Sequence, residues 1–125
     1  MFVGVARLVL QIPGARSLKD RRRVVKSFKD RVRARLPVSV AEVGDVERHQ
    51  VATIGLCVVS NDAARCSSAL SAAARMARQV GDAVLADVAT EITTFGHGGS
   101  GIRGGIEQAL DSDDDFDDDD DWDES

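Results

Sequence analysis

The fold is decided by residues 2–36, which read FVGVARLVLQIPGARSLKDRRRVVKSFKDRVRARL. Residues 2–12 alternate between two faces with the period of a half-buried β-strand, and Pro13-Gly14 ends that strand. Ser17 follows as a helix N-cap, with Asp20 three positions later in place of the usual Glu of a capping box. These residues predict a strand, a tight turn and a helix in direct succession.

The helix is expected to run from about Leu18 to Leu36, because Pro37 cannot continue it. Its apolar side chains recur at helical spacing and predict one buried stripe, made of Leu18, Val25, Phe28, Val32 and Leu36. The remaining sequence predicts, in order, a strand at 38–43, a strand at 50–59, a helix at 63–80 and a strand at 83–95.

Local signals support the second helix and the last strand. Residues 60–62 supply cap side chains for the helix at 63–80, and Gly81 is expected to end it at the C′ position. In the last strand one face is expected to carry Val84, Val88 and Ile92, and the other Asp87, Glu91 and Thr93. The order β-α-β-β-α-β favours an α+β, ferredoxin-like domain over residues 1–95: a four-stranded antiparallel sheet with both helices on one face.

If the even-numbered residues of the strands at 2–12 and 50–59 pack under the helices, the opposite face of the sheet is apolar. That open face would carry Val3, Val5, Val9, Val51, Cys57 and Val59. Such a patch favours a homodimer through the sheets or a protein partner, although scattered apolar residues on a sheet are also common. Residues 49–60 contain no aromatic side chain, so base stacking on the sheet is not expected.

Charge is divided sharply along the chain. The formal net charge of −5 combines 15 basic and 9 acidic residues in 1–94 with 1 basic and 12 acidic residues in 95–125. The acidic average therefore excludes nothing about nucleic acid. Residues 17–36 hold nine basic side chains against two acidic ones. The candidate nucleic-acid-binding residues on this helix are Lys19, Arg22, Arg23, Lys26, Lys29 and Arg33.

Five of those candidates, all except Arg23, fall within an arc of about 80° at helical spacing. Like charges at this spacing oppose helix formation slightly, so folding alone does not require them. An RNA or rRNA surface would explain the cluster, since each cation placed on a phosphate adds sequence-independent affinity. The alternative is a solvated helix face that carries no ligand.

The turn into this helix is a second candidate. Arg16 and Ser17 lie where free N–H groups and the positive end of the helix dipole favour an anion, although capping by Ser17 uses the same groups. An acylphosphatase-like small-anion enzyme would pair Arg16 with Asn61, which also has a structural explanation as a cap residue. No catalytic constellation stands out, so we expect a protein that is not an enzyme.

Metal sites and cofactors are not expected. His49 and His97 lie 48 positions apart without partners at ligand spacing. Cys57 and Cys66 lie among apolar residues and are expected to be reduced buried thiols of a cytoplasmic protein. The N-terminus lacks a signal-peptide pattern, and no apolar run is long enough to span a bilayer, so no membrane association is expected.

The C-terminal sequence has a different character. Residues 96–110 are rich in glycine and predict a linker, and residues 111–125 predict a disordered acidic tail that cannot bury enough apolar surface to order itself. The tail is interpreted as a solubilising segment or as a short motif anchored by Phe116 and Trp122. Such a motif could dock on a partner or compete with nucleic acid for the basic helix.

Four separated stretches also carry a family resemblance: VGVARL at 3–8, SLKDRRRVVKS at 17–27, VSVAEV at 38–43 and VVSND at 58–62. With them, residues 1–94 resemble the YlxP family of small bacterial proteins of undefined biochemistry. The resemblance implies a ferredoxin-like fold and a cytoplasmic location. Genes of that family often neighbour those for transcription antitermination, translation initiation and ribosome-binding factors, which points to RNA or ribosome work.

Together these observations predict a non-enzymatic RNA- or ribosome-associated accessory factor that uses the basic helix, with the acidic tail as a competitor. The alternative is a protein-interaction or homodimerising module without nucleic-acid binding. An acylphosphatase-like enzyme is the weaker alternative.

Overall fold

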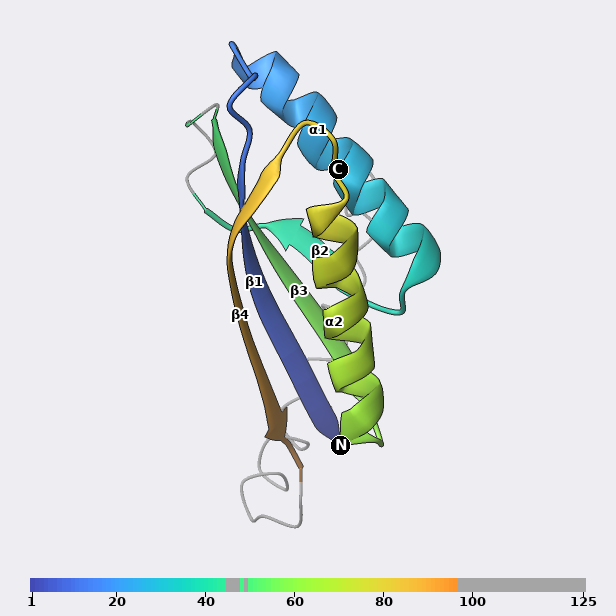
Figure 1. The fold of residues 1–125 in the computed structure, drawn as a ribbon. Coiled ribbons are helices and arrows are strands. Elements are labelled where there is room, and N and C mark those ends of the chain that lie inside the picture. Colours follow the sequence, from blue (N-terminus) through green and yellow to red (C-terminus); the bar gives the residue numbers. More distant parts are fainter. Residues whose placement is uncertain (45–47, 49, 97–125) are drawn as a thin grey trace, which may run out of the picture. The chain divides into compact units, whose positions relative to one another are not determined.

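The computed structural model describes residues 1–44, 48 and 50–96, of which Met1–Phe95 form one compact unit. Its elements are β1 (Phe2–Gln11), α1 (Leu18–Arg35), β2 (Ser39–Glu42), β3 (Val51–Ser60), α2 (Ala63–Arg78) and β4 (Val84–Thr94) (Figure 1). Each element was predicted from the sequence, and their order is confirmed. The expectations for residues 97–110 and for the acidic tail, including Phe116 and Trp122, lie outside the described residues.

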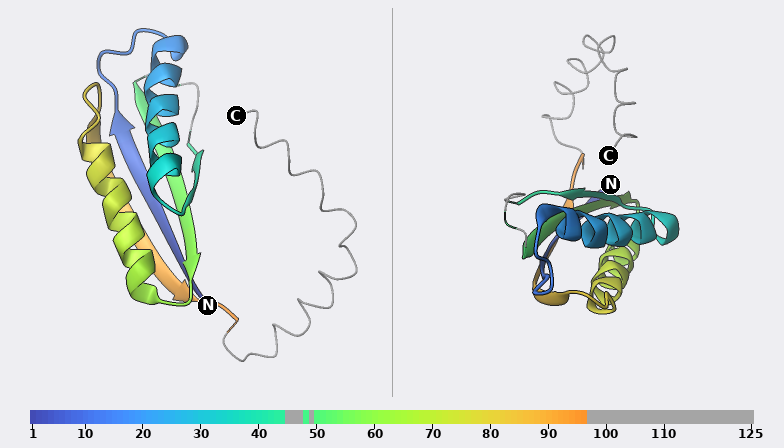
Figure 2. Two further views of the ribbon diagram at one scale, coloured as in Figure 1. Left: turned by 90° about the vertical axis from the view of Figure 1, so that its right-hand side faces the viewer. Right: turned by 90° about the horizontal axis from the view of Figure 1, so that it is seen from above.

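The four strands form one antiparallel sheet in the order β2-β3-β1-β4, so β1 and β3 are the central pair. Both helices lie over the same face of this sheet (Figure 2). This is the ferredoxin-like arrangement, and the predicted fold class is confirmed.

The core lies between the helices and the even-numbered residues of the two central strands, as the alternation predicted. Apart from Phe2 and Ser60 at the strand ends, which are partly buried, those side chains are buried: Ala6, Leu8 and Leu10 of β1, and Ala52, Ile54, Leu56 and Val58 of β3. The helices cover them with Val25, Phe28 and Val32 of α1 and with Cys66, Leu70, Ala73 and Ala77 of α2. A β-carbon at Gly4 would lie about 3.1 Å from the side chains of Leu70 and Val58, so this glycine lets α2 approach β1 closely.

The buried stripe of α1 differs from the predicted one at its first turn. Leu18 is 37% exposed, and Arg21 is buried in the stripe instead, with 2% of its surface exposed. The Arg21 guanidinium forms a salt bridge with Glu42 of β2, and its Nε donates a hydrogen bond to the carbonyl of Val51 on β3 at 3.1 Å. A cation thus takes an apolar position because two strands supply its partners.

Two predictions about α2 and β4 are wrong. Gly81 does not end α2 at C′: the helix is capped by Gln79, and in the described residues only Gly96 has a positive φ. In β4 the register shifts between Val9 and Leu10 of its neighbour, so Val84 pairs with Gln11 and faces away from Val88. One irregularity reverses the side on which Val84 points, because side chains alternate along a strand.

Replacing Arg21 with alanine should lower the free energy of unfolding by about 3–5 kcal/mol, because it leaves the largely buried Glu42 carboxylate without its cation. Urea unfolding followed by circular dichroism measures this loss. The double variant Arg21→Met, Glu42→Leu should recover most of it, because both charges are then removed from the interior. A loss below about 1 kcal/mol for Arg21→Ala would contradict the role given to this pair.

Candidate nucleic-acid interface

The outer surface of α1 is strongly basic. With Arg21 buried, the helix presents eight other basic side chains against Asp20 and Asp30, a net charge of +6. Five of the eight lie within the arc predicted from the sequence, on the flank of α1 next to its buried stripe. We call these five residues the basic ridge: Lys19, Arg22, Lys26, Lys29 and Arg33. Lys29 is half-buried and the other four are exposed. The flank of the ridge nearest the sheet lies toward β2, since Arg33 Nη2 donates to the carbonyl of Val40 at 3.1 Å.

Part of this charge is already paired within α1. Asp30 accepts a hydrogen bond from Lys26 Nζ at 2.8 Å, and its other oxygen lies 3.7 Å from Arg33 Nη1. Arg23, at the outer side of the ridge, pairs with Asp20 at 3.0 Å. These pairs are exposed, and exposed pairs contribute about 0–1 kcal/mol, so a polyanion can displace them.

Partial burial and neighbouring cations both disfavour the charged form of Lys29. The pKa of Lys29 lies below its ordinary value of 10.5, first because the ammonium is partly buried and then because Arg33 and Lys26 repel it. The pKa of Asp30 lies below 3.8, mainly because Lys26 donates a hydrogen bond to the carboxylate. Keeping Lys29 protonated therefore costs free energy, and a phosphate bound beside it would stabilise the charged form.

The turn before α1 satisfies its own groups. The Ser17 hydroxyl accepts from the Asp20 N–H at 3.2 Å, and the Asp20 carboxylate accepts from the Arg16 N–H at 3.0 Å. The helix therefore has the predicted Ser17 cap, and an anion at Arg16 and Ser17 would have to compete with the Asp20 carboxylate. The anion site stays a prediction.

Arg16 and Asn61 do not meet. Arg16 follows the end of β1, whereas Asn61 follows Ser60, which pairs with Phe2 at the beginning of β1. The ten residues of β1 separate the two by about 30 Å. The two side chains on which an acylphosphatase-like site was based therefore lie at opposite ends of the sheet.

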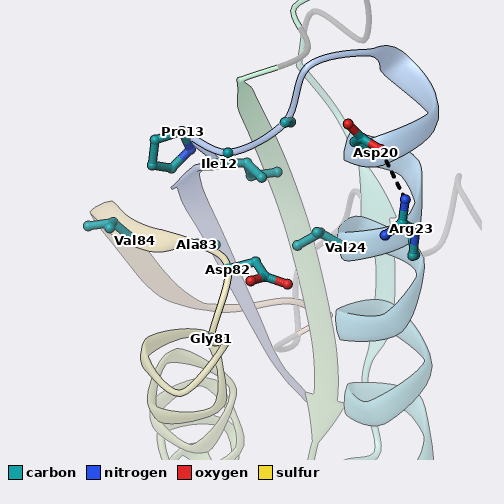
Figure 3. A pocket seen from close by; sticks show the side chains of 11 residues that line it. Ile12, Pro13, Asp20, Arg23, Val24, Gly81, Asp82, Ala83 and Val84 are labelled. Atoms are coloured by element: carbon teal, nitrogen blue, oxygen red, sulfur yellow. Dashed lines mark hydrogen bonds and ion pairs between the residues drawn. The ribbon is translucent and has the colours of Figure 1, made fainter.

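A hollow of about 480 Å³ lies between the β1–α1 turn and the α2–β4 turn. Figure 3 shows Val24 and Asp82 entering it from opposite sides, with the Asp20–Arg23 pair at one wall. Near the two turns the hollow is lined by Ile12, Pro13, Gly14, Ala15, Gly81 and Ala83. It holds no nucleophile paired with a base, so we assign it no reaction.

In the described part of the chain, no group of three or more His, Cys, Asp or Glu residues could hold a metal ion. Cys66 is buried, but Cys57 is partly exposed on the open face of the sheet. His49 and His97 are not among the described residues. Within those residues, no helix is both long enough and apolar enough to cross a membrane.

Comparison with known proteins gives a family and no activity. Two de novo designed proteins are similar in structure: Foldit4, at 16% identity and a TM-score of 0.47, covers 75% of this chain and 98% of its own. LFR1 1, described as having a ferredoxin fold, has 11% identity and a TM-score of 0.43, and covers 79% of this chain and 90% of its own. No curated protein matches the sequence. A family described as "Protein of unknown function (DUF503)" matches residues 3–90, and the chain belongs to that family.

Proposed function

We propose that the protein is a cytoplasmic, non-enzymatic accessory factor that binds RNA, such as rRNA within the ribosome, through the basic ridge of α1. The observation that carries the proposal is the ridge itself: Lys19, Arg22, Lys26, Lys29 and Arg33 on one flank of one helix, with Arg23 beside them. Membership of the YlxP family, whose gene neighbourhood points to RNA, is part of the same proposal.

Folding does not account for this arrangement. Arg22 and Lys26, and likewise Lys29 and Arg33, lie four residues apart, where like charges destabilise a helix by about 0.2–0.5 kcal/mol per pair. Burial and its neighbours also lower the pKa of Lys29. Asp30 offsets part of this repulsion by pairing with Lys26 and Arg33, whereas a phosphate backbone would convert the rest into affinity by counterion release.

The geometry favours binding to the backbone and shape of RNA over reading its bases. The sheet offers no aromatic platform, because the outward residues of β1 and β3 are aliphatic or polar. The ridge consists of flexible Lys and Arg side chains on a rigid helix, which position phosphates and carry little sequence information. We therefore propose low sequence specificity and a strong dependence on salt.

The triple variant Lys26→Ala, Lys29→Ala, Arg33→Ala should weaken RNA binding and flatten its salt dependence. Each lost phosphate contact reduces the slope of log K against log salt by about 0.7–0.9, so the slope should fall by about 2 to 3. Fluorescence anisotropy with ribosomal RNA fragments at several salt concentrations measures both effects.

A matched control removes the same charge elsewhere. Arg65, Arg75 and Arg78 are exposed on α2, and changing all three to alanine also removes three positive charges. If binding depends on the ridge, this control should keep most of the affinity and the slope. If the two triple variants lose RNA affinity and salt dependence equally, binding depends only on the net charge of the protein, and the ridge is not the site.

Lys29→Met should stabilise the fold while it weakens RNA binding. Since the folded pKa of Lys29 is lowered, the unfolded chain binds its proton more tightly, and stability of the unchanged protein rises with pH up to about 10.5. At neutral pH the variant should gain less than about 1 kcal/mol in the free energy of unfolding, because the group is only partly buried, and the gain should vanish at high pH.

Thermal unfolding at several pH values measures this gain in stability. Lys19→Met, on the exposed part of the ridge, is the control. A variant that loses stability at pH 7 would contradict this account.

The acidic tail is proposed to compete with RNA for the ridge. Replacing the aspartates of 111–123 with asparagine in the whole chain keeps its length and removes the competing charge. RNA affinity should then rise, most strongly at low salt, because screening weakens the competitor as salt increases. Unchanged affinity at low salt would leave the tail without a competing role.

A further inference from the structure

The side of the sheet that faces away from the helices, which we call the open face, has an apolar centre. The two central strands place the following residues on it: Val3, Val5, Arg7, Val9 and Gln11 of β1, and Val51, Thr53, Gly55, Cys57 and Val59 of β3. Val5 is 41% and Val59 60% exposed. Central strands that are apolar on both faces are typical of sheets covered on both sides.

The outer strands add a mainly polar rim to this centre, interrupted by Val84, which is 55% exposed, and by Ala89, both of β4. On the open face, β4 contributes Asp87, Glu91 and Thr93, each paired across from an apolar residue of β1, and β2 contributes Ser39 beside Cys57. An apolar centre within a polar rim is the usual anatomy of a protein interface.

The centre of the face is hollowed. Gly55 and Ala89 flank Arg7 in the sheet, and with Val5, Val43 and Glu91 they line a depression of about 350 Å³. Val43, 58% exposed, leans over Gly55, whose added β-carbon would lie 3.0 Å from Val43 Cγ1. Exposed valines and a depression lie on the same face. When two such faces meet, valines of each copy can enter the depression of the other.

We propose that the open face binds the open face of a second copy of this chain, as an isologous dimer. Three strands about 33 Å long and the four-residue β2, about 13 Å long, lie about 4.8 Å apart and cover roughly 540 Å² on each copy, about 1,100 Å² in total. That area exceeds the roughly 1,000 Å² expected of a biological interface, without any contribution from the helices.

The distribution of charge supports a second copy as the occupant. The open face carries both signs, with Arg7 paired to Asp87 at 3.3 Å and Glu91 outside any salt bridge among the described residues, so Arg7 of one copy can meet Glu91 of the other. The basic ridge belongs to the helix layer on the other side of the sheet (Figure 2), so stacking keeps the two ridges apart. Pairing through the β4 edge is less suitable, because an antiparallel register centred on Ala89 would set Asp87 opposite Glu91.

Sedimentation velocity of the whole chain from about 1 to about 500 μM tests the proposal. The expected result is a concentration-dependent shift from the 13.4 kDa monomer to a species of twice that mass. Val5→Lys and Val59→Lys should each raise the dissociation constant at least tenfold, because they bury a charge in the apolar centre. Both positions are exposed in the single chain, so the circular dichroism spectrum should not change. Ser71→Lys, at an exposed position on α2, is the matched control and should dimerise normally.

Cys57 provides a second measurement on the unchanged protein. It lies partly exposed on the open face, whereas Cys66 is buried in the core, so an alkylating reagent should label Cys57 first. Labelling should slow as protein concentration rises, and Val59→Lys should remove that dependence. A monomer at every concentration overturns the proposal. A dimer that forms equally well with Val59→Lys, or that leaves the labelling of Cys57 unchanged, places the interface elsewhere and overturns it too.

Discussion

The position of α1 depends on one buried cation. Arg21 lies under the helix, where it meets Glu42 of β2 and the carbonyl of Val51 on β3, so a single side chain ties the helix to two strands. A buried guanidinium is tolerated only where its hydrogen-bonding groups are satisfied with good geometry. This requirement is directional, whereas the apolar contacts of Val25, Phe28 and Val32 beside it are not. The pair therefore fixes how α1 is rotated about its axis.

The rotation of α1 decides which of its cations reach solvent. With Arg21 turned inward, the residues on the adjacent flank, from Lys19 to Arg33, are held side by side on one outer surface. The sheet divides the molecule into two sides with different chemistry: the basic helix layer on one, and an apolar face with a polar rim on the other. The two proposals use different sides, so binding of RNA and pairing of two copies do not compete for surface.

Period-two and helical spacing predicted the fold and the core well, because the central strands alternate without interruption and Val25, Phe28 and Val32 recur at three- and four-residue intervals. The same spacing extends back to position 21. The burial of Arg21 was not predicted, because a charged residue is expected to be exposed even at a position that fits the apolar stripe. Its partners Glu42 and Val51 are also distant in sequence. Val84 was misplaced because a strand irregularity leaves no mark on composition. The ridge was predictable from helical geometry alone, whereas its pairing with Asp30 depends on side-chain conformations.

The Asp30 carboxylate has a consequence for the kind of anion that the proposed site on α1 would favour. It holds Lys26 and Arg33 at once, so these two cations are bridged before any ligand arrives. A single phosphate that takes over one of these contacts gains little, because it only exchanges one oxyanion for another. A strand with regularly spaced phosphates can satisfy Lys26 and Arg33 separately and also reach Lys19 and Arg22, so its gains accumulate along the helix. If the basic ridge binds RNA as we propose, the internal carboxylate raises the number of phosphates that a ligand must offer, so a polyanion is favoured over a free nucleotide or inorganic phosphate.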